Sequence, residues 1–185
     1  MVQATKLPVD TSADATQLAE TMFGPGVTLV SATYTGDPIS SGIYTDGNSV
    51  APGVVPSDRG IILSTGDASA ITNETGSGDA NQGEGQGSDT EGVDRNEALD
   101  EIAGMFTYDA AILEATFIPV GPVLTMQLVF SSEEYPEYAN TDFNDALRIM
   151  VNGQPVELTI GSGEVSIDNI TQGGTNVSGG QRQRL

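Results

Sequence analysis

The apolar stretches of this chain are short, and most of them end at residues that favour turns. Runs of roughly four to eight apolar or β-branched residues are bounded by Gly, Pro, Asn or Asp along most of the sequence. Such lengths suit strands, whereas a helical bundle needs longer runs with a repeat near 3.6 residues. Glycine is abundant at 23 residues and tryptophan is absent, which also suits thin layers joined by turns. The pattern predicts a mainly β fold, a jelly-roll-like β-sandwich.

The strands are predicted from β-branched content and partial alternation. Asn152 and Gly153 lie between two of them and are a strong signal for a two-residue hairpin turn. The predicted strands cover residues 27–34, 60–64, 112–118, 123–130, 146–151, 155–160 and 165–170. Alternate residues of a strand share one face, so most of the sandwich core is expected from Phe117, Leu124, Met126, Leu128, Phe130, Leu147, Ile149 and Val151.

One short N-terminal helix is predicted over residues 12–22. Ala15, Leu18, Ala19 and Met22 recur at helical spacing, and Asp10-Thr11-Ser12 offers capping oxygens before them. The Gly-Pro-Gly sequence at residues 24–26 ends the run. This helix is expected to pack against a sheet.

Residues 72–101 break the strand pattern because they are rich in Gly and acids and poor in apolar side chains. Such a stretch buries too little apolar area to offset the entropy of ordering it. We therefore expect a long loop with little regular structure over residues 74–92. A loop ordered by Ca²⁺ is the alternative.

The charge balance excludes several classes of partner. The chain has 26 acids and six bases, for a net charge of −20. Nucleic acids are bound by clustered Lys and Arg, so neither they nor anionic lipid are expected as partners. The chain has no His and no Cys, which excludes disulfides, the common zinc and haem sites and His-dependent nucleophilic triads. A cation is the partner that this composition favours.

Neither a signal peptide nor a membrane span is expected in this sequence. Residues 1–10 lack the apolar run of a secretory signal, and no stretch of about 18 apolar residues occurs.

The densest group of candidate ligands lies between two predicted strands, at residues 131–145. Ca²⁺ is bound by six to eight carboxylate, amide or backbone oxygens, and a loop between strands can supply them. The spacing does not match an EF-hand, because the central Gly and the distal Glu are missing. The predicted cofactor is Ca²⁺, and its candidate ligands are Glu133, Glu134, Glu137, Asn140, Asp142, Asn144 and Asp145.

Three other interpretations of this segment stay open. It can be a solvated acidic loop. It can bind carbohydrate, with Ca²⁺ bridging to sugar hydroxyls and Tyr135 or Tyr138 stacking on a ring. It can also form a glycosidase pair from two of Glu133, Glu134 and Glu137, although the absence of Trp disfavours this. The first alternative to a calcium-stabilised scaffold is thus a carbohydrate-binding module, and the second is a carboxylate-based hydrolase.

The same segment resembles the choice-of-anchor L domain, a bacterial extracellular module. The resemblance is carried by VFSSEEYPEY at residues 129–138, FND at 143–145 and VNG at 151–153. It extends over about residues 7–170 through LPVDTS (7–12), SGIY (41–44), APGVVPSD (51–58), GIILSTG (60–66) and TYDAAIL (107–113).

The resemblance implies one domain over residues 1–170, followed by an atypical or truncated tail at 171–185. It also implies a secreted or surface-displayed bacterial protein, with this chain as part of a longer multidomain one. No catalytic residue follows from it. We therefore expect a non-enzymatic module that serves adhesion or surface display and that binds a surface glycan or a protein, with no direct insertion into a membrane.

Overall fold

The computed structural model describes residues 6–71, 89–132, 134, 138–156, 165–172 and 183–184. Within them the strands are all antiparallel, in one three-stranded and four two-stranded sheets. The predicted β class is confirmed at this level, and the jelly-roll-like sandwich stays a prediction. Residues 157–160 of the return strand predicted at 155–160, and most of the loop predicted at 74–92, lie outside the described residues.

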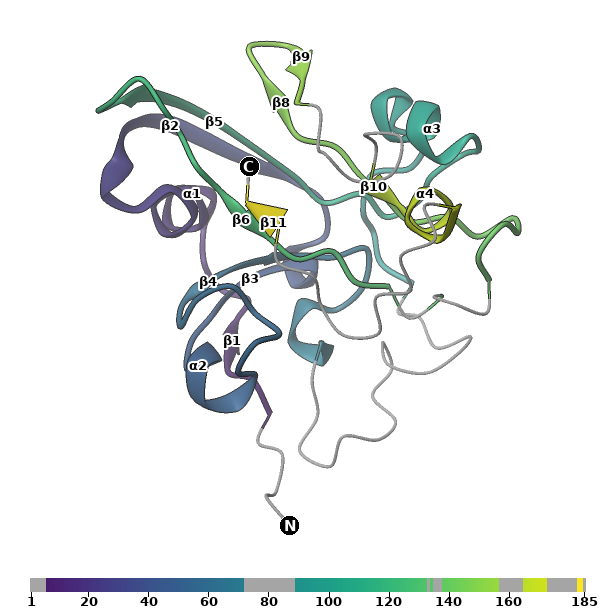
Figure 1. The fold of residues 1–185 in the computed structure, drawn as a ribbon, viewed down its shortest axis with the longest axis horizontal. Coiled ribbons are helices and arrows are strands. Elements are labelled where there is room, and N and C mark those ends of the chain that lie inside the picture. The colour runs from purple at the N-terminus through teal and green to yellow at the C-terminus, as the bar shows by residue number, and fades with distance from the viewer. Residues whose placement is uncertain are drawn as a thin grey trace.

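The N-terminal part of the chain forms the three-stranded sheet and the first helix (Figure 1). The sheet has the order β1-β3-β4, and helix α1 contacts both this sheet and the next pair of strands. A short helix, α2, follows β3. The bounds are β1 (Val9–Asp10), α1 (Ala15–Phe23), β3 (Ser41–Tyr44), α2 (Gly47–Val50) and β4 (Gly60–Leu63).

Helix α1 begins later than its sequence pattern predicts. Asp14, rather than residues 10–12, is the N-cap: its side chain accepts from the backbone N–H of Gln17, and the Gln17 side chain accepts from that of Asp14. This reciprocal pair satisfies two N–H groups that the first turn leaves open. Leu18 and Ala19 are fully buried, so the predicted apolar stripe is confirmed.

A long ribbon of two strands, β2 (Val27–Thr35) and β5 (Ile112–Pro119), lies against the other side of α1 (Figure 1). The end of the helix contacts it through Phe23, whose ring centroid lies 4.6 Å from that of Phe117. The register shifts between Leu29 and Ser31, and this bulge turns Val30 outward.

The C-terminal half consists of short strands and two further helices. The hairpin β8–β9 turns at Asn152 and Gly153, both with positive φ, as the Asn-Gly signal predicts. Helices α3 and α4 lie beside β10 on the opposite side of the molecule from α1 (Figure 1). The bounds are α3 (Glu97–Ala103), β6 (Gln127–Leu128), β7 (Ala146–Leu147), β8 (Met150–Val151), β9 (Gln154–Pro155), β10 (Val165–Ser166), α4 (Ile167–Gln172) and β11 (Gln183–Arg184).

Three predictions about these elements are wrong. The chain has more than one helix: α3 lies where irregular chain was expected, and α4 replaces most of the strand predicted at 165–170. Asn96 caps α3 by accepting from the N–H groups of Ala98 and Leu99, and the Ser166 hydroxyl accepts from Asn169 N–H at the start of α4. Such caps favour helices over extended chain. Only two residues of the strand predicted at 123–130 are paired, in β6.

The core lies mainly around α1 and β3, away from where alternation placed it. Leu124 and Val151 are 40% and 45% exposed, so their prediction as core residues is wrong, while the other six predicted residues are half-buried. The alternating pattern identifies a strand face but not whether another layer covers it. The buried apolar residues include Leu7, Leu18, Ala19, Ile43, Tyr44, Ala103, Ala110, Val165 and Ile167.

In the part of the chain that the structure describes, no helix is both long and apolar enough to cross a membrane.

Candidate functional site

The acidic segment connects β6 to β7, and its described residues form a series of turns. The backbone N–H of Tyr138 donates to the carbonyl of Glu134 over 2.9 Å, and Thr141 donates to the carbonyl of Tyr138 through both its N–H and its hydroxyl. Asn140 has a φ of 63°, in the left-handed region that Asn tolerates better than most residues. These bonds close tight turns within the described part of the segment.

Asp145 and Ser132 join the two ends of this segment. The Ser132 hydroxyl donates to Asp145 Oδ2 over 2.7 Å and accepts from the backbone N–H of Glu134 over 3.1 Å. Burial raises the pKa of the Asp145 carboxyl, and the bond from Ser132 offsets part of that rise. Glu134 and Asp145 therefore share one hydroxyl, Glu134 through its backbone N–H and Asp145 through its carboxylate.

Asn144 links the segment to both C-terminal helices. Its Nδ2 donates to the carbonyl of Ala103 at the end of α3 over 3.0 Å, and its Oδ1 accepts from the backbone N–H of Asp168 in α4 over 3.2 Å. The Asp168 carboxylate in turn accepts from the backbone N–H of Asn140. Both the nitrogen and the oxygen of the Asn144 amide thus form hydrogen bonds that connect the segment to the helices.

The remaining predicted ligands and stacking residues are either in the described part of the segment or outside it. Asn140 and Asp142 are exposed. Tyr138 packs edge-on against Phe143 with 5.2 Å between ring centroids, which occupies part of the surface that sugar stacking would use. Glu133, Tyr135 and Glu137 lie outside the described residues.

Among the described residues, no three acidic side chains come close enough together to share a metal ion. A complete calcium site in this segment would need further oxygens beyond those of Glu134 and Asp145, and Glu133, Glu137 and Asp142 are the other carboxylates that could supply them. The calcium site therefore stays a prediction.

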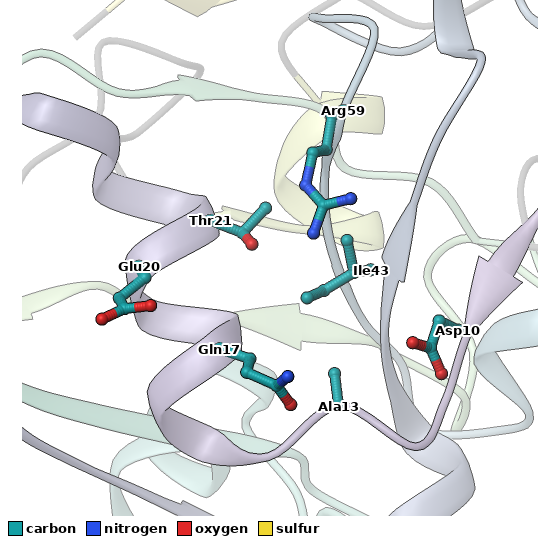
Figure 2. A pocket seen from close by; sticks show the side chains of 7 residues that line it. All are labelled: Asp10, Ala13, Gln17, Glu20, Thr21, Ile43 and Arg59. Carbon is teal, nitrogen blue, oxygen red and sulfur yellow. The ribbon is translucent and has the colours of Figure 1, made fainter.

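A second polar region, which the sequence analysis missed, lies between α1 and the three-stranded sheet (Figure 2). It is an open hollow of about 500 Å³, and the helix contributes residues spaced three or four apart. Its only sequence signal is Arg59, one of few bases in the chain. It is lined by Asp10, Ala13, Gln17, Glu20, Thr21, Ile43 and Arg59.

A smaller hollow of about 410 Å³ lies at the start of α3. Arg148 lines it and forms an ion pair with Glu101, with 2.9 Å between Nη1 and Oε2. Arg95, another of the three arginines before the C-terminal tail, lies over the ring of Phe106 at 4.3 Å from the centroid. Both bases therefore have intramolecular roles.

Comparison with known proteins gives one match. The family model described as the choice-of-anchor L domain matches residues 6–182, which agrees with the resemblance carried by residues 129–153 and extends past residue 170. No curated protein and no solved structure matches this chain. The family is not one of enzymes, and its members suggest a bacterial surface-associated module. Because the match covers nearly the whole sequence, the chain belongs to the choice-of-anchor L domain family.

Proposed function

We propose that this chain is a non-enzymatic module of a bacterial secreted or surface-anchored protein, in which it serves adhesion or display and is stabilised by Ca²⁺. The family match over residues 6–182 carries the proposal of a surface module. Its cellular test is proteolysis of intact bacteria that express the parent protein. An antibody against the domain should lose its signal when protease is added outside the cells. A signal that disappears only after lysis would place the module inside.

The calcium part of the proposal rests on Asp145. Its carboxylate is partly buried and is bonded to Ser132. Arg148–Glu101 is the ion pair found among the described residues, so no described base neutralises Asp145. Burying an ionised carboxylate without a compensating charge is unfavourable. A divalent cation would supply that charge.

The donor chemistry fits Ca²⁺. Glu134 and Asp145 supply hard oxygens from the two ends of the segment, and Glu133, Glu137 and Asp142 are the further carboxylates in it. We propose these five as direct ligands. Asn140 and Asn144 rank below them as candidate ligands, because the Asn144 amide already bonds to Ala103 and Asp168. Ca²⁺ would replace mutual repulsion of the carboxylates with attraction to a shared ion.

Thermal unfolding with and without Ca²⁺ tests this proposal. A ligand that binds only the folded state stabilises it by roughly 2.7 kcal/mol at about 100 times its Kd. In a domain of this size, that corresponds to a rise of several degrees in Tm. NaCl at matched ionic strength controls for screening, and Mg²⁺ controls for divalent charge because it requires a tighter octahedral shell.

A pair of double variants separates a specific site from general charge reduction. Glu134→Gln with Asp145→Asn should remove most of the extra Tm increase that Ca²⁺ causes. Glu91→Gln with Glu114→Gln removes the same charge from two exposed positions elsewhere and should keep that increase. Equal responses to Ca²⁺ and matched NaCl in the wild-type protein would show that the segment is only a solvated acidic loop.

A glycan array probed with Ca²⁺ and with chelator addresses what the module binds. Binding that needs Ca²⁺ would favour the carbohydrate-binding alternative over a scaffold role. Turnover of a polysaccharide that is lost in Glu134→Gln would instead contradict the proposal of a non-enzyme.

A further inference from the structure

The hollow between α1 and the sheet β1-β3-β4 carries charges of both signs in a strongly acidic chain. In Figure 2 the Arg59 guanidinium points into it toward Thr21 and Ile43, and Asp10 and Gln17 lie at the other end, on either side of Ala13. The hollow is built from elements other than the acidic segment, so it is independent of the proposed calcium site.

Arg59 differs from Arg95 and Arg148 in the contacts of its side chain. Arg148 is paired with Glu101 and Arg95 is stacked on Phe106. In the described ranges, the Arg59 side chain has neither an ion pair nor a ring contact. Its planar guanidinium is therefore open to a carboxylate, which it can bind through two parallel hydrogen bonds.

The opposite end of the hollow is fixed in position by local hydrogen bonds. Asp10 Oδ1 accepts from both the N–H and the hydroxyl of Ser12, over 2.9 and 2.6 Å. These two bonds lower the pKa of Asp10, with a smaller contribution from Arg59. Gln17 is held by the capping box with Asp14. Groups that are ordered before binding lose less entropy when a ligand arrives.

Charge decides the class of ligand. One guanidinium with two carboxylates gives the lining a local excess of negative charge, and the whole chain carries −20. A simple anion is repelled by that field, although Arg59 attracts it locally. A ligand that carries an ammonium group beside its carboxylate avoids this repulsion and can pair with charges of both signs in the lining.

We propose that this hollow binds a small zwitterion of the α-amino acid class, with its carboxylate on Arg59 and its ammonium group on Asp10. Thr21 supplies a hydroxyl beside the carboxylate, and Ala13 and Ile43 form an apolar floor for a small side chain. Glu20 lies at the rim and points away from the centre of the hollow.

NMR titration of the ¹⁵N-labelled protein with L-alanine tests the site. Backbone amides of Ala13, Gln17, Thr21 and Ile43 should shift together, with a Kd on the order of 1 mM for so small a ligand. Three analogues dissect the charges. L-alaninamide lacks the carboxylate, N-acetyl-L-alanine lacks the ammonium group, and propionate lacks the amine altogether. Each should bind at least several-fold more weakly than L-alanine.

Substitutions of Arg59 and Asp10 test whether these two side chains cause the binding. Arg59→Gln should raise the Kd for L-alanine about tenfold or more, because a charge-assisted pair is lost. Asp10→Asn should weaken L-alanine more than propionate. Arg95→Gln makes the same change in net charge outside the hollow and should leave the Kd within about a factor of two.

Several results would overturn the assignment. Propionate or N-acetyl-L-alanine binding as tightly as L-alanine would remove the role of Asp10. Shifts confined to residues outside the hollow, or none at millimolar L-alanine, would remove the site. Binding of glucuronate without binding of L-alanine would make it a site for acidic sugars instead.

Discussion

The packing around α1 and β3 differs in kind from that of residues 118–151. Around α1, apolar side chains such as Leu18, Ile43 and Tyr44 are buried, and Gly60 lets the Tyr44 ring lie directly on its backbone. Among the described residues of 118–151 the large apolar side chains are half-buried or exposed. That second region is held through hydrogen bonds of Ser132, Asn144 and Asp145. One region therefore depends on apolar burial and the other on polar contacts.

The largest expected effect comes from truncating one leucine in each region. Leu18→Ala should lower the free energy of unfolding by about 2–5 kcal/mol, because Leu18 is completely buried and the change leaves a cavity. Leu124→Ala should cost about 0.5 kcal/mol or less, since that side chain is already 40% exposed. Chemical denaturation of both variants measures the difference. Equal losses would show that Leu124 is covered and would abolish the contrast.

The next effect tests the polar contacts. Asn144→Ala removes the bonds to Ala103 and Asp168 and leaves the backbone groups of both helices without their partner. A cost of about 1–3 kcal/mol is expected. Asn48→Ala is the matched control, because the Asn48 side chain is exposed on α2. Hydrogen exchange should show α3 and α4 losing protection while α1 keeps it, and a uniform loss would contradict the separation of the two regions.

Asp145 sharpens the comparison through pH. Because the folded protein raises the pKa of this carboxyl above its ordinary value of 3.8, the folded state binds the proton more tightly than the unfolded state. In metal-free buffer, protonation of Asp145 should therefore stabilise the folded state at pH values below 3.8. That stabilisation should be lost as the pH rises through the pKa of Asp145 in the folded protein. Asp145→Asn keeps an acceptor for Ser132 but does not ionise.

The variant should consequently be more stable than wild type at pH 7, with the difference shrinking toward pH 3. Urea denaturation at several pH values measures this difference. A variant that is less stable than wild type at pH 7 would mean that an interaction with the ionised carboxylate outweighs its burial.

The smallest effect is expected at the exposed ion pair. Glu101→Gln should cost about 0.2–1 kcal/mol at low salt and less at high salt, because Glu101 is well exposed and screening weakens its attraction to Arg148. Denaturation at two salt concentrations checks this. A larger cost that does not depend on salt would show that Arg148 needs the pair to stay in place.

Sequence patterns predicted elements well where local chemistry decides the structure. The stripe of α1, the ribbon strands β2 and β5, the strand β4 and the Asn-Gly turn follow from neighbours along the chain. Burial was predicted poorly, because Leu124 and Val151 alternate correctly in strand-like sequence but lie exposed.

The candidate site was predictable only in part for the same reason. The acids and the family motif are readable, whereas the contacts of Asn144 to residues 41 and 24 positions away depend on how the helices dock. Helix α3 was missed because its acidic, Gly-flanked sequence obscured the cap at Asn96. Arg59 and Asp10 line the same hollow because β1 and β4 both pair with β3.

The β2–β5 ribbon has a consequence for how the protein behaves at high concentration. Among the described strands these two pair only with each other, so no described strand covers the outer edge of either one. Val30 and Ile118 add apolar surface nearby, a combination that favours aggregation between copies. The net charge of −20 opposes such contacts at long range, and salt weakens that opposition. The colloidal stability of this protein is therefore expected to fall as ionic strength rises.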